Sequence, residues 1–160
     1  MLQCLRWDRE PAYPGWSGIN QGTMSREAIE IVEHTADWSL RVRGADLGEL
    51  FTNAAKGMAM LMVEDPEALG DYVARSLDLE AYDAESLLVD WLNELAYLAE
   101  MDGIVFNEIE VNDISETRLM ATVRGGEALV LDKHIKAVTF HNLAIQETAS
   151  GLEVTIVFDV

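Results

Sequence analysis

Residues 39–63, SLRVRGADLGELFTNAAKGMAMLMV, change from a two-residue to a three- or four-residue hydrophobic period. Leu40 and Val42 alternate with polar residues, which predicts a short strand. Asp46 then caps a helix over 47–63, because its carboxylate can accept a hydrogen bond from an unpaired N–H of the first turn. A strand followed at once by an amphipathic helix predicts a chain that mixes α and β structure.

The second half of this helix is rich in methionine. Met58 and Met62 fall on the same face as Leu50 and Phe51. Helical spacing of this kind favours a place in the core. The alternative is a soft, adaptable binding surface, which methionine also suits.

The rest of the chain adds one more helix and several strands. Asp83 caps a helix that reaches Asp102, and Gly103 suits the left-handed position after a helix end. The pair Gly125-Gly126 predicts a hairpin turn. We therefore expect an α+β, two-layer domain with two main helices against a mostly antiparallel sheet. The predicted strands occupy residues 28–33, 39–43, 72–81, a segment around 109–111, 119–123, 138–145 and 154–160.

Length and composition indicate a single folded domain. The chain has 160 residues, 49% of them hydrophobic, which is enough for a core without disulfides. Residues 1–24 contain prolines and glycines without a hydrophobic period, so we expect a poorly ordered N-terminal extension before one domain over 25–160. Cys4 is the sole cysteine, which excludes an internal disulfide and a zinc site built on several cysteines.

The charge is strongly acidic. Eleven Lys and Arg residues stand against 29 Asp and Glu residues, which gives a net charge of −18, and no basic residue lies between Arg75 and Arg118. Such a surface repels phosphate backbones, so it disfavours stand-alone nucleic-acid binding and suits a basic protein partner or a cation. A solvated face that only maintains solubility is the alternative. No apolar run approaches a membrane span of about 20 residues, and no signal-peptide pattern is present, so we expect a cytoplasmic protein.

Two aspartates stand beside apolar runs. Asp37 lies between two predicted strands, and Asp159 follows the apolar run 156–158. If those strands pair, the two carboxylates would share a site with the terminal carboxylate of Val160, and such oxygens suit Ca²⁺ or Mg²⁺. In the alternative, each aspartate caps a backbone N–H or faces water. No nucleophile motif or phosphate-binding loop is present, so we assign no catalytic residue.

The only basic cluster of the second half is Lys133, His134 and Lys136. Lys136 begins a strongly β-forming segment. A lysine in that position commonly guards a sheet edge, and the alternative is a contact with phosphate or carboxylate.

Several separated motifs together resemble the archease family, in the right order and over about residues 29–160. The motifs are HTAD at 34–37, LGELF at 47–51 with Ala54-Ala55, LLVDWLNEL at 87–95, IKAVTFH at 135–141 and FDV at 158–160. The resemblance implies a compact α+β fold with strand-helix-strand-strand elements. Two departures are Trp38, where the family often has an aliphatic residue, and Phe140, which replaces a frequent tyrosine.

The resemblance also implies a function. Archeases are cofactor proteins of the RtcB-type tRNA-splicing ligase, which joins RNA ends through a guanylylated histidine. They promote guanylylation and repeated turnover, broaden nucleotide use and catalyse no ligation themselves. RNA would therefore be contacted only through the ligase. The implied metal ligands are Asp37, Asp159 and Val160, with calcium as the ion or magnesium or manganese in its place. Lys136 matches a lysine needed for activation, and His34 and His141 are candidates to orient the ligands.

Two other functions remain open from the residues alone. One is a metal-dependent hydrolase that uses Asp37, Asp159 and His141, which would show activity without a partner. The other is a chaperone-like protein-binding module with the Met-rich helix as its surface, which would not depend on Asp37.

Overall fold

The computed structural model describes residues 28–33, 37–70 and 72–160. The predicted extension at 1–24 and the start of the domain at residue 25 lie outside the described residues. The elements are β1 (Ile29–Glu33), β2 (Trp38–Gly44), α1 (Leu47–Met62), a 3₁₀ helix η1 (Pro66–Ala68), β3 (Tyr72–Glu80), α2 (Ala84–Asp102), β4 (Ile104–Ile114), β5 (Arg118–Glu127), β6 (Ala137–Thr139), β7 (Gln146–Thr148) and β8 (Gly151–Asp159).

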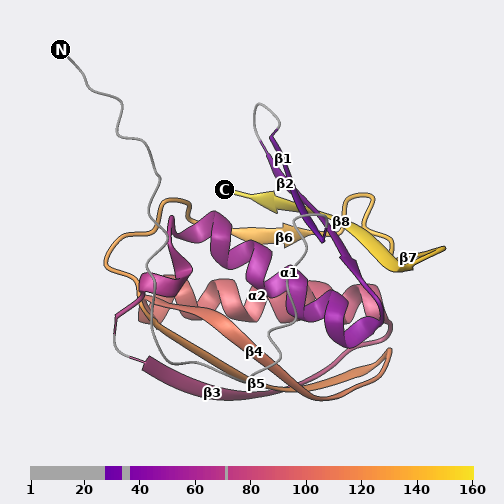
Figure 1. The fold of residues 1–160 in the computed structure, drawn as a ribbon, viewed down its shortest axis with the longest axis horizontal. Coiled ribbons are helices and arrows are strands. Elements are labelled where there is room, and N and C mark those ends of the chain that lie inside the picture. Colours follow the sequence, from indigo (N-terminus) through magenta and orange to yellow (C-terminus); the bar gives the residue numbers. More distant parts are fainter. Residues whose placement is uncertain (1–27, 34–36, 71) are drawn as a thin grey trace, which may run out of the picture.

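The strands of this described part form two antiparallel sheets. One has the order β1-β2-β8-β6, with β7 also paired to β8, and the other has the order β3-β5-β4. Both helices lie between the sheets (Figure 1), and α1 packs against β2 on one side and β4 on the other. The α+β class, the two helices and the antiparallel pairing are confirmed. The helices are covered on two faces, so the domain has three layers where the sequence predicted two.

Helix α1 has the predicted N-terminal cap, and it buries more of its surface than the single apolar face that the spacing predicts. Asp46 Oδ1 accepts a hydrogen bond from the Glu49 N–H at 2.9 Å, while Glu49 Oε2 accepts one from the Ala45 N–H at 2.6 Å. Met58 and Met62 are both buried in the core, whereas Met60 on the opposite side of the helix is 47% exposed. The core prediction for these methionines is confirmed.

Helix α2 also begins and ends where the sequence predicts. Asp83 Oδ1 accepts from the Ser86 N–H at 2.7 Å, and Gly103 closes the helix with φ +69°. Trp91 is fully buried and its Nε1 donates to the Phe51 carbonyl at 3.2 Å, which ties the two helices together.

The prediction of a hairpin turn at Gly125-Gly126 is wrong, because both glycines lie inside β5. A Cβ on Gly125 would overlap the carbonyl oxygen of Val105 on β4, and one on Gly126 would lie 2.8 Å from the Gly70 carbonyl oxygen. The glycines are therefore needed for the close approach of backbones rather than for a turn.

Two predicted strands also have different bounds. β4 begins at Ile104, directly after the helix, because its first residues are buried on both faces and show no alternation. The strand predicted over 138–145 stops at Thr139. There the Leu143 N–H donates to the Phe140 carbonyl at 3.1 Å, and Asn142 takes a positive φ of 53°, so the chain turns before β7.

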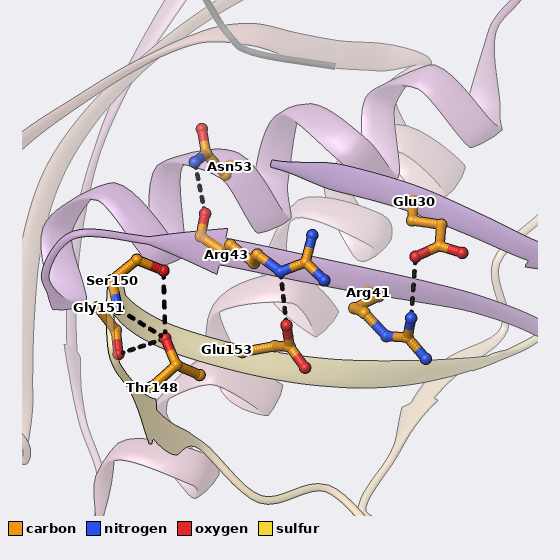
Figure 2. Close-up of polar contacts among 8 residues, drawn as sticks. All are labelled: Glu30, Arg41, Arg43, Asn53, Thr148, Ser150, Gly151 and Glu153. Atoms are coloured by element: carbon orange, nitrogen blue, oxygen red, sulfur yellow. Dashed lines mark hydrogen bonds and ion pairs between the residues drawn. The ribbon is translucent and has the colours of Figure 1, made fainter. Parts of the chain in front are cut away.

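Ion pairs cross the outward face of the five-stranded sheet. Arg41 pairs with Glu30 on β1 at 3.0 Å, and Arg43 pairs with Glu153 on β8 (Figure 2). Asn53 on α1 donates to the Arg43 carbonyl at 2.8 Å, which joins the helix to the same strand. Of these contacts, the Arg43–Glu153 pair joins β2 to β8, the two strands whose register positions the candidate site.

Candidate functional site

Three segments that are distant in the sequence meet at the end of β8. The β2–β8 register pairs Trp38 with Phe158, so Asp37 and Asp159 are each the next residue beyond this last pair. On the other side of β8, Ala137 pairs with Asp159. The Lys136 N–H donates to the Asp159 carbonyl at 2.8 Å. The structure therefore brings Asp37, Asp159 and Lys136 to one end of one sheet.

The two aspartates lie on the outward side of this sheet. Phe158 points into the core, and because side chains alternate along a strand, Asp159 points away from it. Both Asp37 and Asp159 are exposed. Neither side chain has a hydrogen-bond or ion-pair partner among the described residues. Like charges directly opposite one another destabilise a sheet, so a bound cation would relieve their repulsion.

Lys136 is held by its backbone while its side chain is exposed. Ile135 before it is buried in the core, and the Val138 N–H after it donates to Asn93 Oδ1 on α2 at 2.9 Å. Its ammonium group makes no ion pair with a described residue. The end of β8 thus carries two exposed carboxylates and one exposed lysine, none of them paired with a described residue. Val160 follows β8, is half-buried and lies beside the same backbone segment.

A second lysine approaches the site in a way that the sequence analysis missed. Lys133 Nζ lies 3.8 Å from the ring centre of Trp38, the residue after Asp37. This cation–π contact joins the loop that precedes β6 to the start of β2. Its only signal in the sequence is a tryptophan where the resembled family often has an aliphatic residue, because no local spacing connects positions 38 and 133.

The structure describes two of the three histidines. His34 lies outside the described residues. His141 lies on the turn that follows β6, and since β6 runs from Ala137 opposite Asp159 to Thr139 opposite Val157, the chain carries His141 away from the aspartates. His134 faces Glu100 on α2, with Nδ1 3.0 Å from Oε1.

The donor set has the chemistry of a hard-cation site but is small. In the parts of the chain that the structure describes, no group of three or more His, Cys, Asp or Glu side chains is placed to hold a metal. Two side-chain carboxylates therefore carry the site, and any further ligands must come from the Val160 carboxylate, water, backbone oxygen or a partner.

The groups with shifted pKa values lie elsewhere. Tyr72 donates a 2.6 Å hydrogen bond to Glu108, and this bond, with burial and the carboxylate's charge, raises the pKa of Tyr72 to about 12. Hydrogen bonds from the Arg118 guanidinium lower the pKa of Asp78, and those from Ser86 lower the pKa of Asp83. These groups stabilise the three-stranded sheet and the start of α2.

The chain matches proteins of known sequence over nearly all of its described part. The model of the Archease protein family (MTH1598/TM1083) matches residues 29–160. The chain is 39% identical to the archease of Methanosarcina barkeri over 139 residues, which covers 82% of this chain and 94% of that protein. It is 36% identical to the archease of Thermococcus gammatolerans over 131 residues, covering 76% of this chain and 90% of that protein.

Two solved structures share the fold. The solution structure of protein 1598 of Methanobacterium thermoautotrophicum has a TM-score of 0.65 and 26% identity, covering 84% of this chain and 99% of that one. The crystal structure of an archease of Thermotoga maritima, described as a possible chaperone, has a TM-score of 0.55 and 23% identity, covering 81% of this chain and 94% of that one. No helix among the described residues is long and apolar enough to cross a membrane.

Proposed function

Because this chain belongs to the archease family, we propose that it activates an RtcB-type RNA ligase in tRNA splicing and catalyses no ligation itself. The observation that carries the proposal is the meeting of Asp37, Asp159 and Lys136 at the end of β8. These residues come from three distant segments, and two neighbouring like charges at the end of paired strands lower stability, which supports a functional reason for keeping both aspartates.

The arrangement suits work at the active site of another protein. Lys136 can offset the negative charge of a nucleotide phosphate while the ligase histidine is guanylylated. The buried side chain of Ile135 and the hydrogen bond from the Val138 N–H to Asn93 hold the backbone around Lys136 in place. This backbone therefore loses little conformational entropy when a partner binds. The net charge of −18 complements a basic RNA-binding rim and would speed docking there.

We also propose that Asp37 and Asp159 hold a divalent cation, calcium in the first instance with magnesium or manganese as substitutes. Hard carboxylate oxygens are the ligands that these ions prefer. The bound ion would supply positive charge beside Lys136. The resemblance adds the terminal carboxylate of Val160, and an extension of the chain beyond Val160 tests that ligand separately, since it would weaken calcium binding in a calorimetric titration.

The test of function is RNA ligation by a cognate ligase kept well below the concentration of its RNA substrate. We expect repeated turnover with the wild-type protein and a single turnover with Asp37→Ala or Lys136→Ala. Asp113→Ala and Lys56→Ala are matched controls, because they remove the same charges from positions far from the end of β8. A single turnover in every reaction, with a ligase shown to be competent, contradicts the proposal.

The two other functions lack a supporting observation. The hydrolase needs His141 beside the aspartates, but β6 leads it away. The chaperone-like module needs a Met-rich surface, but Met58 and Met62 are buried and α1 exposes only Met60 of its three methionines. A hydrolase would also act on phosphate or ester substrates without any partner, which the same protein preparations can test directly.

A further inference from the structure

A groove lies beside Lys136, between α2 and the segment that leads into β6. One wall comes from α2 residues spaced three and four apart, so they share one face of the helix. The other wall is residues 135–137. The groove has a volume of about 440 Å³. The residues that line the groove include Asn93, Ala96, Tyr97, Glu100, Met101 and Lys136.

The helix wall of this groove is apolar and open to solvent. Tyr97 is 57% exposed and Met101 is 65% exposed, although both are large hydrophobic residues one turn apart. Ala96, beside Tyr97, is buried and also lines the groove. Tyrosine and methionine are enriched at protein interfaces, where a ring and a flexible thioether adapt to an inserted side chain. The groove has room for one large apolar side chain.

The surroundings of the groove are acidic. Every charged side chain of α2 is a carboxylate, and Asp90 and Glu94 precede the tyrosine on the same side of the helix. Glu100 faces His134 across the groove's edge. A partner segment with Lys or Arg beside its apolar residue would gain from this charge, and an acidic segment would be repelled.

The groove adjoins the candidate site through Lys136. Lys136 contributes to the groove wall, and its N–H is bonded to the Asp159 carbonyl. The groove lies on the side of the sheet that α2 covers, whereas Asp159 points to the outward side. A partner seated between Tyr97 and Lys136 would reach the aspartates by extending around the end of β8.

We propose that this groove is the docking site for the ligase, which inserts an apolar side chain flanked by basic residues between α2 and residues 135–137. The inference rests on the proposed function, since the ligase is the partner named there. It separates two roles: the groove supplies affinity, and the end of β8 supplies activation.

The test compares binding with activation. Tyr97→Ser and Met101→Ser, measured by calorimetry against the cognate ligase, are each expected to raise Kd by about tenfold. Both are expected to keep full activation when the protein is saturating. Tyr82→Ser is the matched control, because Tyr82 is 98% exposed just before α2 and outside the groove. Asp37→Ala is expected to show the reverse pattern, with Kd unchanged and activation lost.

Charge reversal tests the chemistry of the partner segment. Asp90→Lys is expected to slow association several-fold, whereas Asp113→Lys on the three-stranded sheet, which makes the same charge change, is expected to have a smaller effect. Equal slowing by both would contradict basic residues at the groove.

The outcomes distinguish the two proposals. Groove variants that bind like the wild type overturn the docking site and leave activation untouched. A wild-type protein that binds through the groove but never raises turnover overturns the function alone, and one that does not bind the ligase overturns both. If sedimentation shows a dimer that Tyr97→Ser dissociates, a second copy of the chain occupies the groove, and the docking proposal is wrong.

Discussion

Asp37 and Asp159 each follow the last residue pair of β2 and β8, and no described residue neutralises either charge. In the sequence each aspartate looks like an ordinary strand-end residue. Their proximity depends on the pairing of β2 with β8, which lie more than 100 positions apart and have no local signal. Spacing alone therefore could not decide between two isolated carboxylates and a shared site, and only the resemblance to a family favoured the second.

The repulsion between these carboxylates has a measurable consequence for stability. Without divalent cations, Asp159→Asn is expected to raise the free energy of unfolding by about 0.5 kcal/mol, because one of two opposed charges is removed. Added calcium is expected to stabilise the wild type more than the variant. Thermal melts in chelator and in calcium measure both effects, with Asp113→Asn as the control. A calcium gain of equal size in both proteins would contradict a shared site.

The pairing of Asp78 with Arg118 predicts a particular pH dependence. Two hydrogen bonds from the guanidinium, at 3.0 and 2.8 Å, lower the pKa of the Asp78 carboxyl group. A carboxyl group whose pKa falls on folding adds stability above its unfolded-state pKa of about 3.9, and this contribution is lost as the pH falls through the folded-state value.

Asp78→Asn is therefore expected to be less stable than the wild type at pH 5–7. The difference should disappear in acid, below the folded-state pKa of the wild-type group. Urea unfolding midpoints across this range measure it. A difference that stays constant down to the acid limit would mean that the carboxylate charge is not the source of the stability.

At the scale of the elements, both helices could be predicted because their signals are local. Asp46 and Asp83 cap the starts, and Gly103 closes the second helix. The prediction of a turn at Gly125-Gly126 was wrong because glycine suits two different local structures. A glycine pair allows a turn, but it equally allows one strand to approach the backbone on both of its sides, and only the neighbouring segments distinguish these uses.

Gly125→Ala is expected to destabilise the protein by about 3 kcal/mol, because the added methyl group meets backbone that cannot move without breaking the β4–β5 pairing. Gly70→Ala is the matched control. Its new Cβ would lie 3.5 Å from the nearest atom, which is an ordinary contact. Denaturant unfolding of the two variants provides the comparison, and equal stabilities would contradict the steric explanation.

The contact between Lys133 and Trp38 is expected to hold the loop before β6 against the start of β2. A cation–π contact at a partly exposed site contributes about 0.5–1 kcal/mol, so Lys133→Gln should speed amide exchange in this loop by about two- to fivefold. The N–H groups of Asp132 and Lys136 are the probes, since they donate to Met62 and Asp159. Lys133→Arg should restore slow exchange, and a failure to do so would exclude the cation–π contact as the cause.

At the scale of the whole molecule, the net charge of −18 has opposite effects on folding and on docking. Carboxylates repel one another in the compact state, whereas they attract a basic partner. Raising salt to about 0.5 M reduces the screening length to a few ångströms. We therefore expect a higher melting temperature for the protein alone and a slower association with the ligase. An association rate that is unaffected by salt would contradict electrostatic steering.

The position of β8 delays the closing of its sheet during synthesis. β8 is the last of the described strands, yet it lies inside its sheet between β2 and β6. While the ribosome makes the earlier elements, β2 keeps one edge unpaired and one side of the helices is uncovered. The residues that close the sheet also carry Asp159 to the end where Asp37 and Lys136 lie. A chain that is cut short before β8 therefore loses the closed sheet and the candidate site together.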